Sequence, residues 1–166
     1  MKNLVEFINR LNVWVGKAIA WLVVFLVLLI VFDVVLRYLF NIGSVANAEL
    51  EWHLFGAIIL LGLGYAYQQD RHVRVDVFYQ RFSPKQKEWV NLIGTAIFLL
   101  PFCMVAAYKS WPFVMSSFTI QETSPDPGGL PARYIIKSAI PIGFVLLGLQ
   151  GIAKMIESLQ VILRHD

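Results

Sequence analysis

Long apolar runs separated by short polar stretches are the main pattern of this chain. A helix that crosses a hydrocarbon core of about 30 Å needs roughly 20 apolar residues, and aromatic rings often mark its two ends. Four segments show both features, at about residues 14–36, 50–67, 89–108 and 134–156. The pattern predicts an all-α integral membrane protein, in which residues 1–166 form a single membrane domain with four transmembrane helices.

Two further segments have an amphipathic pattern that is typical of helices lying in the membrane interface. Residues 3–13 place Leu4, Phe7 and Ile8 on one face, opposite charged and amide side chains. Residues 72–83 carry large apolar side chains at helical spacing, although the first half of this segment alternates as a strand would. We favour a short interfacial helix for this segment, because an unpaired strand at a membrane surface leaves its edges unsatisfied.

The third span is expected to begin with a cap of its own. Ser83 can accept a hydrogen bond from the first turn, Pro84 suits a first helical position, and Gln86 completes a capping box. Further along the same helix, Pro101 lacks a backbone N–H donor, so it predicts a kink.

Lysine and arginine residues predict the orientation of the chain, because they are more frequent on the cytoplasmic side of membrane proteins. With the N-terminus inside, four of the 14 basic residues face outward and the others inward. The outward four are Arg37, Lys109, Arg133 and Lys137. This asymmetry predicts that both termini lie in the cytoplasm (N-in/C-in) and that a loop at about residues 111–133 lies in the periplasm.

Composition narrows the function. Hydrophobic residues make up 58% of the chain and charged residues only 15%, against about 25% in a typical soluble domain. Although the net charge is +3, the basic residues flank the apolar runs instead of forming a phosphate-binding stripe, so we expect no nucleic-acid partner. The one cysteine, Cys103, excludes an intrachain disulfide and any chemistry that needs a cysteine pair.

The ionisable residues give little support to an enzyme or to a complete ion carrier. The middles of all four predicted spans lack charge, whereas proteins that move ions normally carry ionisable groups there. Asp33 and Arg37 form an i, i+4 pair that suits the interface, with docking on another subunit as the alternative. Of the three histidines only His53 could lie in a span, and membrane haems usually need histidine pairs. We expect no catalytic residue, cofactor or metal site.

Several polar and small residues remain as candidates for structural or partner contacts. Glu49, Trp52 and His53 share one helical face, where they either cap and anchor the second span or contact another helix or subunit. In the fourth span, Gly143 and Gly151 recur at a spacing that permits close helix approach, either within the chain or with a partner.

Two loops complete the set of candidates. In the outer loop, prolines and glycines predict a stiff, turn-rich connection in which Glu122 and Asp126 could bind a basic patch of a partner. In the inner loop, which includes His72, the charged pair Arg74 and Asp76 could fix the turn after the second span, locally or with a partner subunit. The alternative for both loops is a plain connector.

The order of short motifs along the chain resembles the small, four-helix membrane subunit (Q-type) of tripartite ATP-independent periplasmic (TRAP) transporters. The motifs cover nearly the whole chain: Arg37-Tyr38, Glu49-Leu50, residues 62–67, residues 72–76, Glu122-Thr123-Ser124, Gly128-Gly129-Leu130-Pro131, residues 140–143 and Gln150-Gly151. Each motif is weak alone, and the specificity comes from their order and spacing. The chain departs from the pattern at Ala46-Asn47-Ala48, where a tryptophan often precedes the glutamate.

The resemblance implies an accessory, scaffold role in a sodium-coupled uptake transporter of the bacterial inner membrane. In that family a periplasmic solute-binding protein captures the solute, often an organic acid, and a large multi-span subunit carries the solute and sodium sites. The small subunit joins the large one and enlarges its stationary scaffold, in contact with membrane lipids. Two alternatives come from other classes: a membrane anchor subunit of a redox enzyme complex, which needs haem or quinone ligands, and a small drug exporter, which needs a carboxylate deep in a span.

Overall fold

The protein folds as a bundle of long helices. The structure, a computed structural model, describes residues 2–69 and 82–164. Its helices are α1 (Lys2–Phe40), α2 (Val45–Gln68), α4 (Pro84–Gly94), the π-helical segment η1 (Thr95–Leu99), α5 (Leu100–Thr119) and α6 (Tyr134–Arg164). Because α4, η1 and α5 follow one another without a break, they count as one of four stretches that are long and apolar enough to cross a membrane. The expected all-α protein with four membrane-spanning helices is confirmed.

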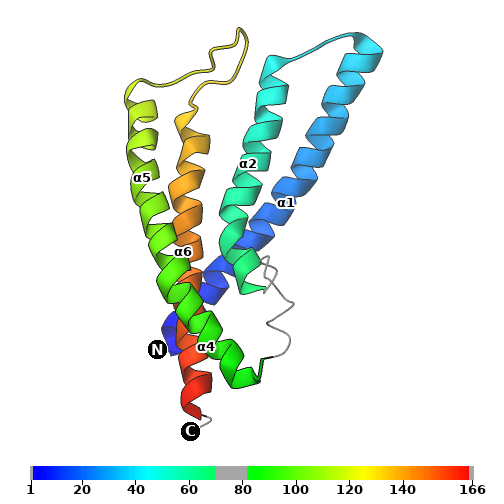
Figure 1. Ribbon diagram of the computed structural model, residues 1–166. Helices are drawn as coiled ribbons and strands as arrows, with labels where there is room; N and C mark the ends of the chain where they lie inside the picture. Colours follow the sequence, from blue (N-terminus) through cyan, green and yellow to red (C-terminus); the bar gives the residue numbers. More distant parts are fainter. Residues whose placement is uncertain (1, 70–81, 165–166) are drawn as a thin grey trace.

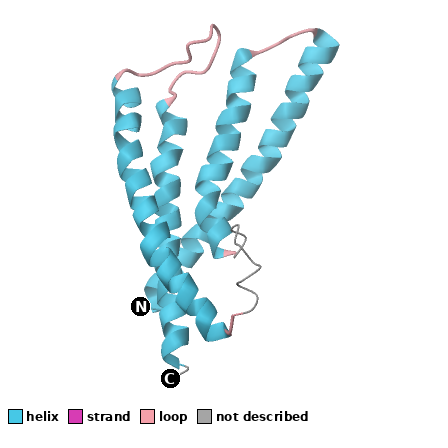
Figure 2. Ribbon diagram, in the orientation of Figure 1, coloured by secondary structure: helices cyan, strands magenta, loops and turns pink. Residues whose placement is uncertain are grey.

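Both termini lie at one end of the bundle, and the other end carries two connections (Figure 1). We call these the terminal end and the loop end. The loop end holds residues 41–44, between α1 and α2, and the longer loop of residues 120–133, between α5 and α6. Figure 2 shows the helix pairs α1–α2 and α5–α6 spreading apart toward the loop end. α6 packs against α2, α5, α4 and α1 and so occupies the centre of the fold.

α1 is one uninterrupted helix of 39 residues, although the sequence pattern divides it into an interfacial helix and a span. No proline interrupts it, so nothing in the backbone forces a break. The apolar residues at the start of α1 have two different environments. Val5 and Ile8 pack against Ala153 of α6, while Leu4 and Phe7 are 51% and 65% exposed. The difference arises because α6 lies alongside the start of α1, which an isolated amphipathic pattern cannot reveal.

The expected capping box at the start of α4 is confirmed. Ser83 Oγ accepts a hydrogen bond from the Gln86 N–H at 3.3 Å, and Gln86 Oε1 accepts one from the Ser83 N–H at 2.9 Å. Just before Pro101, where the sequence predicts a kink, the helix contains the π-helical segment η1. A wider turn relieves the clash between a proline ring and the preceding turn. It also leaves Thr95 buried, with its hydroxyl oxygen 2.7 Å from that of Tyr67 in α2.

α5 continues to Thr119, so the loop at the loop end is shorter than the predicted 111–133. The predicted span ends at Tyr108, because aromatic rings often mark the ends of spans, but the helix continues through Pro112. A proline removes one intrahelical hydrogen bond. Contacts with α6 offset that loss. One of them is the edge-to-face contact between the Phe118 and Tyr134 rings, whose centroids are 5.2 Å apart.

Glycine residues of α6 set its close approach to α2 and η1. A Cβ atom on Gly143 would lie 2.8 Å from the carbonyl carbon of Leu60 in α2, too close for any real side chain. A Cβ atom on Gly151 would lie 2.7 Å from the Leu99 side chain of η1. Of the two alternatives for these small residues, contact within the chain is therefore the one that the fold uses.

Candidate interaction sites at the two ends of the bundle

At the loop end, the long loop binds the carboxylate of Glu49. The cap of α2 is Ser44, whose Oγ accepts from the Asn47 N–H at 3.2 Å, so Glu49 is not the cap. Glu49 is only 5% exposed. Its Oε1 accepts a hydrogen bond from the Ser124 hydroxyl at 2.5 Å, and its Oε2 accepts one from the Leu130 N–H at 2.6 Å. Hydrogen bonds to an ionised acceptor are among the strongest in proteins, so this contact anchors the loop to α2.

The loop is folded around this anchor. The Ser124 N–H donates to the Leu130 carbonyl at 3.0 Å, and the Gly129 N–H donates to the Asp126 carbonyl at 3.0 Å. The glycine before Gly129 has a φ of 81°, a left-handed conformation that favours glycine. A Cβ atom on Gly129 would lie 2.8 Å from Glu49 Oε2. The loop backbone can therefore reach the carboxylate only because no side chain is present there.

A second contact holds the loop to α6. Lys137 Nζ donates a hydrogen bond to Glu122 Oε2 and forms an ion pair with it. The same amine lies 4.1 Å from the centroid of the Phe113 ring, a cation–π geometry. The hydrogen bond from Lys137 lowers the pKa of Glu122 below its ordinary value. Of the two acidic side chains that the sequence offers for docking, Glu122 is thus engaged within the chain, whereas Asp126 is exposed.

The ion pair predicted near the end of α1 is present. Arg37 Nη2 donates to Asp33 Oδ2. Asp33 is 1% exposed and also lies near α2, where Asn47 Nδ2 is 3.4 Å from its Oδ1. The Arg37 side chain remains 56% exposed. The pair therefore has one member directed into the bundle and one with much of its surface available to another molecule.

At the terminal end, polar side chains form a continuous chain of hydrogen bonds between α1 and α6. Asn9 Nδ2 donates to Glu157 Oε1 at 3.1 Å, and Asn9 Oδ1 accepts from Gln150 Nε2 at 2.8 Å. Asn12 Nδ2 donates to Gln150 Oε1 at 2.8 Å, and these two residues are 0% and 1% exposed. Gln68 joins α2 to the group by donating to the Asn9 carbonyl at 3.2 Å. We call Asn9, Asn12, Gln150 and Glu157 the polar ladder.

The polar ladder was not predicted from the sequence. A signal was present at Gln150, which interrupts the apolar run of the fourth span, whereas Asn12 precedes the first predicted span. Polar side chains inside membrane helices usually bind one another across helices. Gly64 of α2 makes room for the ladder, because a Cβ atom there would lie 3.1 Å from Asn12 Cγ.

His53 faces the groove between α2 and α6. It lines a cavity of about 420 Å³ together with apolar side chains of both helices. Its ring centroid lies 3.9 Å from that of Trp52, and the Arg133 guanidinium lies 5.5 Å from the Trp52 ring. The face shared by Glu49 and His53 therefore meets the loop and α6 of the same chain.

The remaining predicted residues divide into two groups. Pro131 is exposed in the loop at the loop end. His72, Arg74 and Asp76 lie outside the described residues, as does most of the interfacial segment 72–83. Their expected roles stay predictions.

The fold and these contacts define a multi-pass membrane protein whose buried carboxylates bind groups of its own chain. Within residues 2–69 and 82–164, no three His, Cys, Asp or Glu side chains are grouped so that they could hold a metal ion. The sequence matches the family of tripartite ATP-independent periplasmic transporters, DctQ component, over residues 26–161. The chain belongs to this family. A protein of Haemophilus influenzae described as a TRAP transporter small permease is 27% identical over 166 residues, which cover 100% of this chain and 98% of that protein. No solved structure matches the chain.

Family membership confirms the resemblance and several expectations that followed from it. The protein is a transporter component and not an enzyme, and it is a multi-pass protein of the bacterial inner membrane. The alternative of a redox-enzyme anchor finds no support in this family.

Proposed function

We propose that this subunit binds the large membrane subunit of a sodium-coupled TRAP transporter for an organic acid and enlarges its stationary scaffold. The observation that carries the proposal is the use of the buried carboxylates. Among the described residues, Asp33 and Glu49 are the buried acidic side chains. Asp33 binds Arg37, and Glu49 binds the loop, so both serve this chain's own architecture. A sodium or solute path needs such ligands to be available, which supports transport by the partner subunit.

The outer surface of the bundle supports a role as an accessory subunit. Large apolar side chains are exposed along α1, η1 and α5; Trp21, Leu28, Phe98 and Met104 are each more than 60% exposed. In a membrane, such faces contact lipid tails or the helices of another subunit. The family is named as one component of a tripartite transporter, which supports a second membrane subunit as the occupant of part of this surface.

Reconstitution tests the proposal. The chain is purified alone and with the large subunit of the same transporter, and each preparation is placed in proteoliposomes with the solute-binding protein and an imposed sodium gradient. We expect the two membrane subunits to copurify and to take up solute together, and the small subunit alone to show no uptake. Saturable uptake by the isolated small subunit, or failure of the two to copurify, would overturn the proposal.

We further propose that the loop of residues 120–133 faces the periplasm and receives the solute-binding protein. Glu49 and Lys137 hold the loop at two points, which lowers the entropic cost of binding a partner. Between Ser124 and Leu130, the two loop residues that Glu49 binds, Pro125, Asp126 and Pro127 are exposed. Asp126 is thus the acidic side chain of this loop that can meet a basic patch on the binding protein, whereas Glu122 is already paired.

Charge reversal distinguishes docking from a plain connector. Because contacts at a rim act mainly on encounter rate, Asp126→Lys should raise the binding-protein concentration needed for half-maximal uptake, and the effect should fade as salt increases. Asp126→Asn serves as the matched neutral control and should have a smaller effect. An unchanged half-maximal concentration for Asp126→Lys at low ionic strength would leave the loop as a connector.

A further inference from the structure

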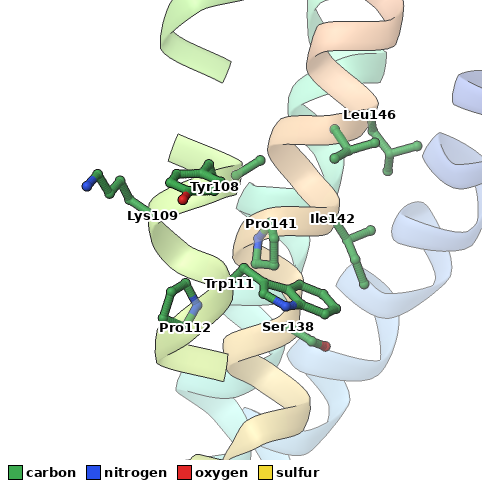
Figure 3. A pocket seen from close by; sticks show the side chains of 10 residues that line it. Tyr108, Lys109, Trp111, Pro112, Ser138, Pro141, Ile142 and Leu146 are labelled. Carbon is green, nitrogen blue, oxygen red and sulfur yellow. The ribbon is translucent and has the colours of Figure 1, made fainter. Parts of the chain in front are cut away.

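A second groove lies on the outer side of the bundle, where α5 and α6 run next to each other. It has a volume of about 780 Å³ and is lined mostly by apolar side chains. Figure 3 shows Trp111 of α5 lying across toward Ile142 and Ser138 of α6, with Pro141 beside it. Tyr108 and Trp111 remain 75% and 58% exposed, although rings of this size dominate the energy of contacts when they become covered.

A single cation borders this groove. Lys109 is exposed, and no carboxylate of the described residues lies within ion-pair distance of it. Its amine lies 5.9 Å from the centroid of the neighbouring Tyr108 ring. Lys109 precedes the end of α5 at Thr119 by ten residues, which corresponds to about 15 Å along the helix. An unpaired charge on the outer face of a membrane helix is costly, so it indicates a partner.

The direction of Lys109 favours a protein partner over a lipid headgroup. A lysine that binds a lipid phosphate extends toward the membrane surface. In Figure 3 the Lys109 side chain instead extends sideways from α5, away from α6 and not toward Pro112 and the loop end. A carboxylate carried on a neighbouring membrane helix would meet the amine from this side.

We infer that the α5–α6 groove and Lys109 form the docking surface for a membrane helix of the large subunit, and that this helix carries an aspartate or glutamate at the level of Lys109. The inference rests on the proposed association with the large subunit and adds which face is used. The incoming helix packs on the α5 side of the groove, against Tyr108 and Trp111, and its carboxylate pairs with Lys109, which extends from α5 on the side away from α6. Polar contacts of this kind between membrane helices fix orientation as well as affinity.

Site-specific photo-crosslinking in the assembled complex tests the surface. A photoreactive phenylalanine analogue is placed at position 108 or 142, and at position 28 on the exposed face of α1 for comparison. We expect adducts with the mass of the large subunit at 108 and 142. If the complex forms but both positions give only lipid-sized adducts or none, the docking surface is wrong while the proposed association stands. If no complex forms, the proposed function itself fails.

Substitution of the lysine tests the charge. Lys109→Gln should weaken association with the large subunit roughly threefold to twentyfold, the range measured for interhelical polar contacts. Lys109→Arg keeps the positive charge and should retain most of the affinity. Lys17→Gln removes an exposed lysine from α1 and serves as the control. Because Lys109 is exposed, the unfolding temperature of the isolated subunit should not change. Equal affinities for Lys109→Gln and wild type would overturn the charge pairing.

Discussion

The N–H group of Leu130 donates a hydrogen bond of 2.6 Å to the carboxylate of Glu49, a residue 81 positions earlier in the chain. Together with the Ser124 hydroxyl on the other carboxylate oxygen, this bond joins the start of α2 to the far arm of the loop. The α5–α6 hairpin and α2 are thereby connected at the loop end, where the helix pairs spread apart (Figure 1).

Neutralising Glu49 should release the loop. Glu49→Gln removes the negative charge, so the bonds to Ser124 and Leu130 lose their charge-assisted strength, and the amide offers one acceptor oxygen where the carboxylate offers two. We expect faster tryptic cleavage at Arg133 in detergent and an unfolding temperature lowered by several degrees. Asp126→Asn, an exposed site in the same loop, should cleave at the wild-type rate. Equal cleavage of Glu49→Gln and wild type would show that this anchor does not restrain the loop.

The helix contact at Gly143 should be sensitive to a single methyl group. Gly143→Ala places a Cβ atom against the Leu60 backbone, and we expect a loss of about 1–3 kcal/mol in stability as α2 and α6 are pushed apart. Gly94→Ala is the matched control, because nothing lies within 4 Å of that site, and alanine there should be neutral or stabilising. Chemical or thermal unfolding of both variants in one detergent measures the difference.

The polar ladder should show coupling between α1 and α6. Asn12→Leu and Gln150→Leu each leave a buried partner without its hydrogen bond, so each should destabilise the protein. The double variant should cost less than the sum of the two, with a coupling energy of about 0.5–2 kcal/mol. A double-mutant cycle from unfolding measurements gives this value, and strict additivity would contradict the pairing.

The contribution of the Glu122–Lys137 pair should depend on pH. Because the pKa of Glu122 is lowered in the folded protein from its ordinary 4.5, the stabilisation is present above that value and is lost as the pH falls through the folded pKa. The unfolding temperature of wild type should exceed that of Glu122→Gln by a few degrees at pH 7. The difference should shrink as the pH falls below 4.5. A difference that stays constant down to pH 3 would exclude this origin.

Orientation can be measured by cysteine labelling. Cys103 is 3% exposed, and Cys103→Ala provides a background without thiols. In intact cells, a membrane-impermeant maleimide should label Asp126→Cys, while Lys2→Cys should react only after the membrane is opened. The reverse pattern would place the loop end in the cytoplasm and would remove the basis for its docking of a binding protein.

The spans, the capping box and the Asp33–Arg37 pair could be predicted because each depends on residues close in sequence. An apolar run that is long enough to cross the membrane favours the hydrocarbon core whatever the other helices do, so the run alone predicts a span. Ser83 with Gln86, and Asp33 with Arg37, are neighbours on one helix, so their spacing alone brings them together.

Contacts between distant residues were beyond the reach of the pattern. The loop contact of Glu49 and the polar ladder join positions more than 70 apart, and only the packing of α6 against α2 and α1 brings them together. The end of α5 was also misjudged, because the aromatic rings at residues 108 and 111 are typical of the end of a span. Pro112 is a strong local signal for a break, but membrane helices tolerate proline where neighbouring helices support the turn.

The continuity of α1 gives the molecule a mechanical property. A helix of 39 residues is about 58 Å long, and it resists bending because each turn is bonded to the next. The polar ladder holds it to α6 near one end, and from Asn12 the helix continues for about 42 Å to Phe40. Each degree of rotation about the ladder moves the far end by about 0.7 Å. The angle between α1 and α6 at the ladder, together with the packing of α1 against α2, therefore sets where Arg37 lies at the loop end.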